Sequence, residues 1–195
     1  MPRSSDLRRT SALAELVDDP ARRLIVSGLG TAAFDAARLT DDGGNLFAID
    51  GAMGAAVSVG LGLALARPDR SVLVITGDGE VLMNVGALAT AAVQAPANLS
   101  ILCIDNGVWG LTGAQATHTS HGADLTAIAA GCGIATALTV ASSEELAQGR
   151  AALADDTQLT FVRLALEPEP PEPYPFDRDG AAIRRRFRDA LAPAR

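Results

Sequence analysis

The chain has 195 residues, enough for one domain with a sizeable core, and because only 4% of them are aromatic that core must be aliphatic and rich in alanine. A net charge of −7 argues against a protein that binds nucleic acid or an anionic membrane surface. No apolar stretch is long enough to span a membrane, and the N-terminal residues lead into no apolar signal-peptide core, so we expect a cytoplasmic protein with no membrane partner.

Apolar runs typical of β-strands alternate with helical patterns along most of the chain. The expected strands are residues 24–28, 45–50, 71–76, 99–105, 134–140 and 159–166. Short apolar strands separated by helices indicate a buried parallel sheet that is covered on both faces. We therefore predict an α/β fold with a doubly wound, mostly parallel sheet of about six strands, preceded by a short helix near residues 8–17. Cys103 lies in the fourth run and is expected to be a buried structural thiol.

The composition divides the chain into three regions: a helical lead-in at 1–20, the α/β domain at 21–166, and a Pro/Glu-rich linker with a basic C-terminal helix at 167–195. The linker should be extended, because proline fixes φ and lacks a hydrogen-bond donor. In the last helix Ile183 and Phe187 are four residues apart and arginines surround them. This apolar stripe packs either on its own domain or on a partner subunit, and the sequence leaves both open.

A first glycine-rich motif, "GLGTAA" at 28–33, follows the first strand and opens a helix. It matches G-x-G-x-x-A, and Asp50 ends the second strand 22 residues later (50 − 28), where a dinucleotide fold keeps its ribose-binding acid. Such matches are frequent by chance in chains rich in alanine and glycine. The motif therefore leaves a nicotinamide-binding oxidoreductase as one hypothesis, and in any case free N–H groups at this helix start could face a phosphate.

The second glycine-rich motif, "TGDGEV" at 76–81, places Asp78 at the carboxyl end of a predicted central strand. Gly77 and Gly79 let the backbone turn sharply there. Asn106 follows the next strand 28 residues later (106 − 78), about the length of a strand–helix–strand unit, so both side chains should lie at the ends of neighbouring strands. Either residue alone is ordinary turn chemistry. Together their oxygens suit Mg²⁺ or Ca²⁺ bound to a diphosphate.

This spacing of GDG and Asn resembles the signature of thiamine-diphosphate enzymes in their diphosphate-binding domain, over about residues 24–166. The resemblance implies that Asp78, the side chain of Asn106 and the carbonyl of Val108 bind Mg²⁺. It also implies that Gly79 and Glu80 offer backbone N–H groups to the diphosphate.

The resemblance extends to the two preceding turns. It puts Gly30 and Thr31 of the first turn on the same diphosphate. The segment "DGAMGAA" at 50–56 is similar to the one under the aminopyrimidine, where Met53 would be the bulky residue that bends the cofactor and the Gly51 carbonyl would accept from the 4′-amino group. The set of expected cofactor contacts is completed by Gly77, Trp109 and Gly110. The small residues after Met53, including Gly60 and Gly62, are explained by close helix packing.

Within this family, "GDGEVLMNVGALAT" and "DNGVWGLTGAQATHTSHGADL" are most similar to the branch that decarboxylates phosphonopyruvate and sulfopyruvate. Two positions depart from the family pattern. Glu80 stands where many relatives have a small residue, and Asp105 replaces the first of two paired asparagines. Neither departure removes an expected metal ligand.

The family requires a glutamate that activates the cofactor, and this glutamate belongs to a separate pyrimidine-binding domain for which the chain has no second set of strands. We therefore expect a separate pyrimidine-binding (alpha) subunit to supply it, in a heterotetramer or larger assembly. Gln115 and His118 are the candidates for substrate contact in the loop after Asn106. The other polar or aromatic residues of that loop, each of which could instead face solvent, are Trp109, Thr112, Thr117, Thr119, Ser120 and His121.

The resulting hypothesis is the diphosphate-binding (beta) subunit of a Mg²⁺/thiamine-diphosphate-dependent decarboxylase acting on an acidic 3-substituted pyruvate. The alternatives are a thiamine-diphosphate carboligase subunit, a nicotinamide-dependent oxidoreductase that relies on Asp50, and a non-catalytic subunit.

Overall fold

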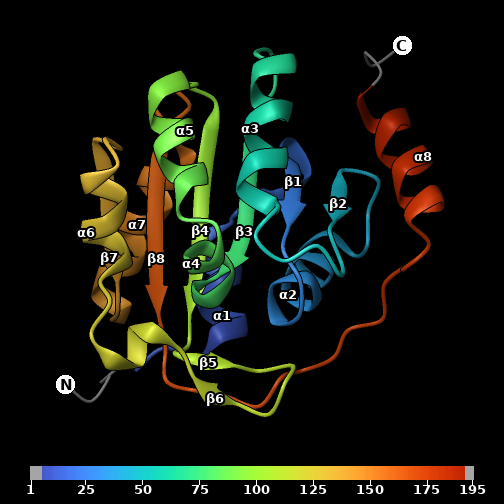
Figure 1. Cartoon of the computed structure of the whole chain (residues 1–195). Coiled ribbons are helices and arrows are strands. Elements are labelled where there is room, and N and C mark those ends of the chain that lie inside the picture. Colours follow the sequence, from blue (N-terminus) through green and yellow to red (C-terminus); the bar gives the residue numbers. More distant parts are fainter. Residues whose placement is uncertain (1–5, 192–195) are drawn as a thin grey trace.

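The computed structural model describes residues 6–191, in which a parallel sheet lies between two layers of helices (Figure 1). The strands of this sheet are β1 (Leu24–Ser27), β2 (Leu46–Ala48), β3 (Val72–Gly77), β4 (Leu99–Asp105), β7 (Thr136–Val140) and β8 (Thr160–Ala165). The α-helices are α1 (Arg9–Leu16), α2 (Thr31–Thr40), α3 (Ala56–Ala66), α4 (Asp78–Met83), α5 (Gly86–Gln94), α6 (Leu125–Gly131), α7 (Leu146–Ala154) and α8 (Gly180–Leu191). The predicted doubly wound α/β fold is confirmed, and the early helix expected near 8–17 is α1.

The two faces of the sheet carry alternate side chains of the same strands. Ile25 and Leu73 belong to the cluster covered by α1, α2 and α7, whereas Val26 and Val74 belong to the cluster covered by α3, α5 and α6. All four side chains are fully buried, which explains why the strands read as continuous apolar runs. Cys103 on β4 is likewise fully buried, as expected for a structural thiol.

The strand order is β2-β1-β3-β4-β8-β7, and every neighbouring pair is parallel. The chain reverses direction across the sheet at β1, which lies between β2 and β3, and open α/β sheets bind ligands at such a switch point. β3 pairs with β4 up to the last residue of β3, Gly77, which lies opposite Ile104, the residue before the end of β4. Asp78 and Asn106 therefore follow adjacent strands at the same edge, as the spacing predicts.

A small antiparallel hairpin lies beyond this edge. It consists of β5 (Val108–Trp109) and β6 (Gln115–Ala116) and leads into a 3₁₀ turn, η2 (His118–His121). Two further 3₁₀ turns are η1 (Pro20–Arg22) and η3 (Ser143–Glu145). This hairpin could not be predicted from strand periodicity, because its strands have two residues each.

The C-terminal helix α8 packs on its own chain beside β2, after a segment without helix or strand (Figure 1). The ring centroids of Phe187 and Phe47 are 5.4 Å apart, and Arg186 forms an ion pair with Asp42 at 2.8 Å. The Arg67 guanidinium donates to the Leu191 carbonyl. These contacts answer the question that the sequence left open: the apolar stripe of this helix covers its own domain.

Only one of the glycines assigned to close helix packing on α3 serves that purpose. A Cβ at Gly60 would lie 2.2 Å from Cγ2 of Val74 on β3, whereas a Cβ at Gly62 would meet no atom within 4 Å. The expectation is therefore confirmed for Gly60 and wrong for Gly62, which lies on the exposed side of the helix. No helix among residues 6–191 combines the length and the apolarity that a membrane span needs.

Candidate functional site

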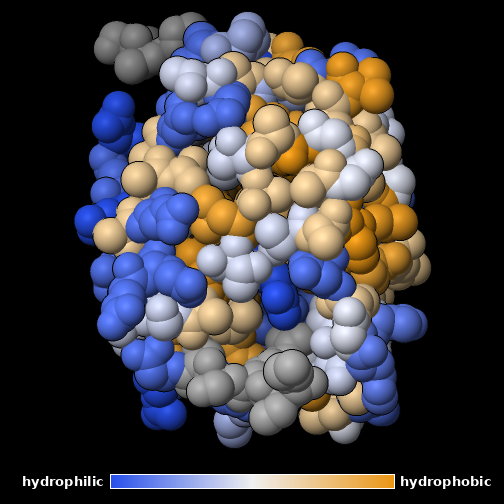
Figure 2. Space-filling model, turned by 90° about the vertical axis from the view of Figure 1, so that its left-hand side faces the viewer, coloured by the Kyte–Doolittle hydropathy of each residue, from blue (hydrophilic) through white to orange (hydrophobic). Residues whose placement is uncertain are grey.

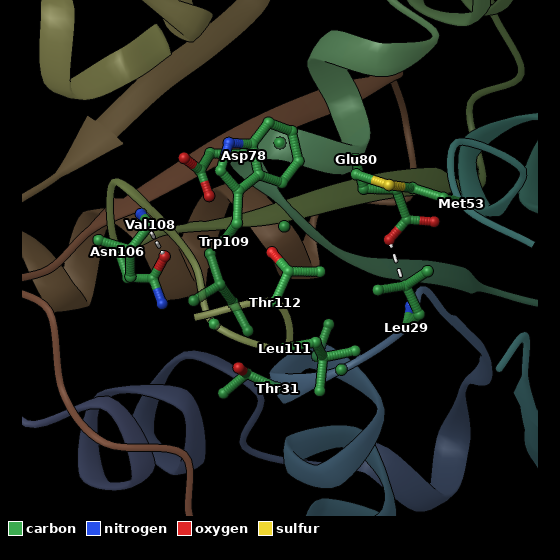
Figure 3. A pocket seen from close by; sticks show the side chains of 16 residues that line it. Leu29, Thr31, Met53, Asp78, Glu80, Asn106, Val108, Trp109, Leu111 and Thr112 are labelled. Carbon is green, nitrogen blue, oxygen red and sulfur yellow. Dashed lines mark hydrogen bonds between the residues drawn. The ribbon is translucent and has the colours of Figure 1, made fainter. Parts of the chain in front are cut away.

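A cavity of about 250 Å³ lies at the carboxyl ends of β3 and β4, beside the turn between β1 and α2 (Figure 3). Eleven of the twelve residues expected to bind the cofactor line it: Gly30, Thr31, Met53, Gly77, Asp78, Gly79, Glu80, Asn106, Val108, Trp109 and Gly110. Gly51 does not; it lies in an exposed loop two residues before Met53. The fold thus gathers three turns that are up to 80 residues apart (110 − 30) around one space.

Asp78 is held by two threonines of the loop after β4. Thr117 and Thr119 donate their hydroxyls to its Oδ2 oxygen, with oxygen–oxygen distances of 2.5 and 2.9 Å. The Asp78 side chain is only 3% exposed, and this burial raises the pKa of its carboxyl; the Thr117 hydrogen bond opposes that shift and the nearby charge of Asp105 adds to it. Two threonine hydroxyls therefore orient this carboxylate. From the sequence alone, both threonines could equally have faced solvent.

Asp105, the departure from paired asparagines, is fully buried and compensated. Its Oδ2 forms an ion pair with Nε of Arg163 on β8 at 2.6 Å, and its Oδ1 accepts from Thr119 at 2.8 Å. Thr119 therefore contacts both carboxylates. Arg163 balances a second negative charge next to the expected metal ligands, and this balance could not be seen in the sequence because β8 begins 55 residues after Asp105 (160 − 105).

Asn106 and Val108 form a tight turn at the end of β4. The Val108 N–H donates to Oδ1 of Asn106 at 3.1 Å, and Gly107 between them has a φ of +71°, which glycine adopts without strain. In the described part of the chain, no cluster of three or more His, Cys, Asp or Glu side chains is placed to hold a metal. A cation here would rely on one carboxylate with amide and carbonyl oxygens, a donor set that Mg²⁺ accepts.

The charged side chains that line the cavity are all acidic. Its sixteen lining residues include two carboxylates, Asp78 and Glu80, and no arginine or lysine. The first turns of α2 and α4 also line the cavity, and the start of a helix favours an anion because its first N–H groups have no acceptor within the helix ladder. A phosphorylated ligand could therefore use these donors, but it would need a cation to offset the carboxylates.

The Glu80 side chain points away from Asn106, toward the turn after β1 (Figure 3). One carboxylate oxygen accepts from the Leu29 N–H and the other from the Gly54 N–H, both at 3.3 Å. Burial raises the pKa of this carboxyl, although the hydrogen bonds act against the shift. The sequence placed Glu80 at the site only through its backbone, so this side-chain position was not foreseen.

The hairpin forms an apolar wall over the cavity. The Trp109 ring lies against Gly79, where an added Cβ would be 2.0 Å from Cζ3 of the ring, and Leu111 lies over Gly30 in the same way at 3.1 Å. Leu111 lines the cavity but is largely exposed, and no motif in the sequence pointed to it.

A second, more open hollow of about 570 Å³ adjoins the first and contains both candidate substrate residues, Gln115 and His118. Met53, Gly79, Trp109 and Thr112 line both spaces. The Gln115 amide bonds to Thr112, donating to its carbonyl at 2.8 Å and accepting from its hydroxyl at 2.9 Å.

Two other polar residues of this loop lie elsewhere. Ser120 donates to the Gly107 carbonyl at 2.7 Å, and His121 lines neither hollow.

Asp50, on which the dinucleotide hypothesis depends, is not part of the site. Its carboxylate pairs with Arg178 at 3.4 Å and does not line the cavity, although the "GLGTAA" turn does. The structure therefore keeps the phosphate-binding potential of that turn and gives no support to a ribose-binding acid.

Comparison with known proteins agrees with this geometry. Residues 28–164 match the family model described as "Thiamine pyrophosphate enzyme, C-terminal TPP binding domain". The chain is 45% identical to a phosphonopyruvate decarboxylase of Streptomyces viridochromogenes over 80% of its own length and 38% of that protein. It is 40% identical to the sulfopyruvate decarboxylase subunit beta of Methanocaldococcus jannaschii, over 71% of this chain and 72% of the relative.

Among solved structures, a putative thiamin diphosphate-dependent enzyme from Mycobacterium smegmatis superposes with a TM-score of 0.66 at 26% identity, covering 86% of this chain and 34% of that one. The chain thus spans about two fifths of the phosphonopyruvate decarboxylase and most of the beta subunit. The matched region contains all three turns that surround the cavity. The chain belongs to the family of C-terminal TPP-binding domains of thiamine pyrophosphate enzymes.

Proposed function

We propose that the chain is the diphosphate-binding subunit of a Mg²⁺/thiamine-diphosphate-dependent decarboxylase whose substrate is an acidic 3-substituted pyruvate, such as sulfopyruvate or phosphonopyruvate. The observation that carries this proposal is the acidic cavity at the ends of β3 and β4, which has N–H donors and oxygen ligands but no basic side chain. A diphosphate in this cavity would need a cation, held by Asp78, to offset the negative charges. The names of the relatives supply the substrate class.

The residues present fit the cofactor. Asp78, Asn106 and the Val108 carbonyl would hold Mg²⁺, and the first turns of α2 and α4 would bind the diphosphate. When bound, thiamine diphosphate supplies the electron sink for decarboxylation. Met53 lines both hollows, and His118 and Gln115 line the second one, where they would contact the substrate.

The acid that activates the cofactor is expected from a partner. Among the described residues, the carboxylates that line the cavity are Asp78 and Glu80; the first would be the metal ligand, and the second accepts hydrogen bonds from the Leu29 and Gly54 amides. The relation to a beta subunit along most of its length supports a separate alpha subunit. A heterotetramer or a larger assembly would place this subunit against the cavity.

The surface next to the cavity suits such a partner. Residues 51–66 and 81–104, which include α3 and α5, contain no charged side chain. The exposed large apolar residues of this surface are Val59, Leu65, Met83, Val85 and Val93. Apolar residues gather along the right-hand edge of Figure 2, the side that faces the viewer in Figure 1. Apolar surface that lacks charge is typical of protein interfaces.

The test is calorimetry with thiamine diphosphate, with and without Mg²⁺, on the chain co-expressed with its partner subunit. Wild type should bind only with Mg²⁺, Asp78→Ala should lose binding, and Asp50→Ala should bind like wild type. Equal binding by Asp78→Ala would contradict the metal site, and loss in Asp50→Ala would favour a dinucleotide instead.

Product analysis completes the assignment. With sulfopyruvate or phosphonopyruvate, the pair should release CO₂ and the matching aldehyde. A ligated product formed from two 2-oxo acids would identify a carboligase, and turnover by this chain alone would contradict the need for a partner.

A further inference from the structure

The Glu80 side chain connects three segments that line the cavity. It starts in the first turn of α4, and its two carboxylate oxygens accept from Leu29, in the turn between β1 and α2, and from Gly54, in the loop before α3. The side chain is 5% exposed, and no cationic side chain forms a salt bridge with it among residues 6–191. The Thr76 hydroxyl and the Ala56 N–H also stabilise the charged form, so polar groups of the chain, and no cation, offset the cost of burying this carboxylate.

Gly28 provides the space for this carboxylate. A Cβ at position 28 would lie 1.7 Å from Oε2 of Glu80, and its three nearest atoms all belong to that carboxylate. The backbone of Gly28 does not adopt a positive φ, so its conformation suits any residue. The reason for glycine at this position is thus the room that Glu80 occupies.

We propose that Glu80 is a positioning residue that ties the β1–α2 turn and the loop before α3 to the first turn of α4. Gly28 is required because it leaves the space that the Glu80 carboxylate fills. The inference concerns the side chain of Glu80 and goes beyond the backbone contact with diphosphate. It rests on the proposed function only where cofactor affinity is the measurement. The tie itself is a property of the chain and can be measured without the cofactor.

Charge and positioning predict opposite effects on affinity. A carboxylate beside a diphosphate repels it, so an effect of charge alone would make Glu80→Gln bind the cofactor more tightly. If the carboxylate positions two turns, Glu80→Gln keeps one acceptor oxygen, loses the other and binds more weakly. Because both oxygens are used by amides of separate turns, we expect the positioning effect to dominate.

The experiment compares Glu80→Ala, Glu80→Gln, Gly28→Ala and the double variant Gly28→Ala/Glu80→Ala, with Gly62→Ala as the matched control. Amide exchange is followed by NMR on the full chain. In Glu80→Ala, the Leu29 and Gly54 amides should exchange about tenfold faster, because each loses a hydrogen bond to a charged acceptor. Gly28→Ala should produce the same change, because its methyl group displaces the carboxylate. Gly62→Ala should leave both amides unchanged.

The second readout is the affinity of the co-expressed pair for thiamine diphosphate with Mg²⁺. Glu80→Ala and Gly28→Ala should each bind the cofactor about tenfold more weakly, because in both variants each of the two turns loses its hydrogen bond to the Glu80 carboxylate. The double variant should be no weaker than Glu80→Ala, since the methyl group then has nothing to displace.

Three results would overturn the proposal: unchanged exchange at both amides in Glu80→Ala, tighter cofactor binding by Glu80→Gln, or additive losses in the double variant. If the Gly28→Ala chain does not fold, Glu80→Gln and the double variant still decide. If the wild-type pair does not bind thiamine diphosphate, the proposed function fails, and the exchange data alone confirm or reject the tie.

Discussion

Replacing Thr117 by valine removes one hydroxyl that holds the expected metal ligand and changes little else in shape. Thr117 is buried, and its hydroxyl donates to Oδ2 of Asp78 at 2.5 Å. In the variant the Thr119 hydroxyl still contacts this oxygen, but its single proton is shared between Asp78 and Asp105. The Asp78 carboxylate is then less firmly oriented toward the cavity.

The size of the effect follows from the lost contact. A hydrogen bond to a charged group contributes about 1.5–3 kcal/mol, and outer-shell partners of metal ligands typically change metal affinity by about 10–100-fold. These two estimates agree, since about 1.4 kcal/mol corresponds to tenfold. We expect Thr117→Val to weaken Mg²⁺ binding within this range, and Thr117→Ser to bind like wild type because it keeps the hydroxyl.

The assay is a Mg²⁺ titration of the co-expressed pair in the presence of thiamine diphosphate, followed by calorimetry. Thermal unfolding is recorded in parallel, so that a loss of folding is not mistaken for a loss of affinity. If a folded Thr117→Val variant binds Mg²⁺ as tightly as wild type, the hydroxyl does not orient the ligand and the reasoning is refuted.

Three further predictions test the wall, the core and the partner surface. Gly79→Ala should lower the free energy of unfolding by about 1–3 kcal/mol, because the added methyl group overpacks against Trp109. It should also shift the fluorescence emission of this sole tryptophan, and an unshifted emission would contradict the prediction. In a Trp109→Ala background the same substitution should not change the free energy of unfolding. Arg9→Met should lower the free energy of unfolding in urea by about 3–5 kcal/mol, because it leaves the buried Asp35 carboxylate, 3.1 Å from Nε of Arg9, without its ion-pair partner. The double variant Arg9→Met/Asp35→Leu should recover most of that loss. Equal losses in the single and double variants would refute the pairing. Val93 is 81% exposed, so Val93→Glu should change the free energy of unfolding by no more than about 0.5 kcal/mol. It should weaken association with the expected alpha subunit, measured by sedimentation. Unchanged association would show that Val93 is not part of the interface.

The fold was predictable because its signals are local. Parallel strands buried on both faces need uninterrupted apolar runs, and six such runs separated by helical patterns are present. The neighbourhood of Asp78 and Asn106 was also predictable, because a right-handed crossover between parallel strands brings the two strand ends to one edge. Residue types that suit Mg²⁺ at those two ends then pointed to the cofactor.

The groups that surround these residues depended on contacts between distant parts of the chain. In the sequence Thr117 and Thr119 are ordinary loop residues, and they contact Asp78 only because the chain after β4 folds back over it. Arg163 reaches Asp105 only because β8 pairs with β4. An amphipathic stripe shows that a helix buries one face but not against what, so the docking of α8 on its own domain was undecided.

The sequence by itself determined the sheet and the edge at which Asp78 and Asn106, the expected metal ligands, lie, because strand periodicity and the length of a crossover are properties of short segments. Only the tertiary structure decided where the Glu80 carboxylate goes, because its position depends on a missing Cβ at Gly28 and an amide at Gly54, which are brought to it by two other turns. It also showed that Asp78 and Glu80, the acids that line the cavity among the described residues, already accept hydrogen bonds, which supports the proposal that a partner subunit supplies the activating glutamate.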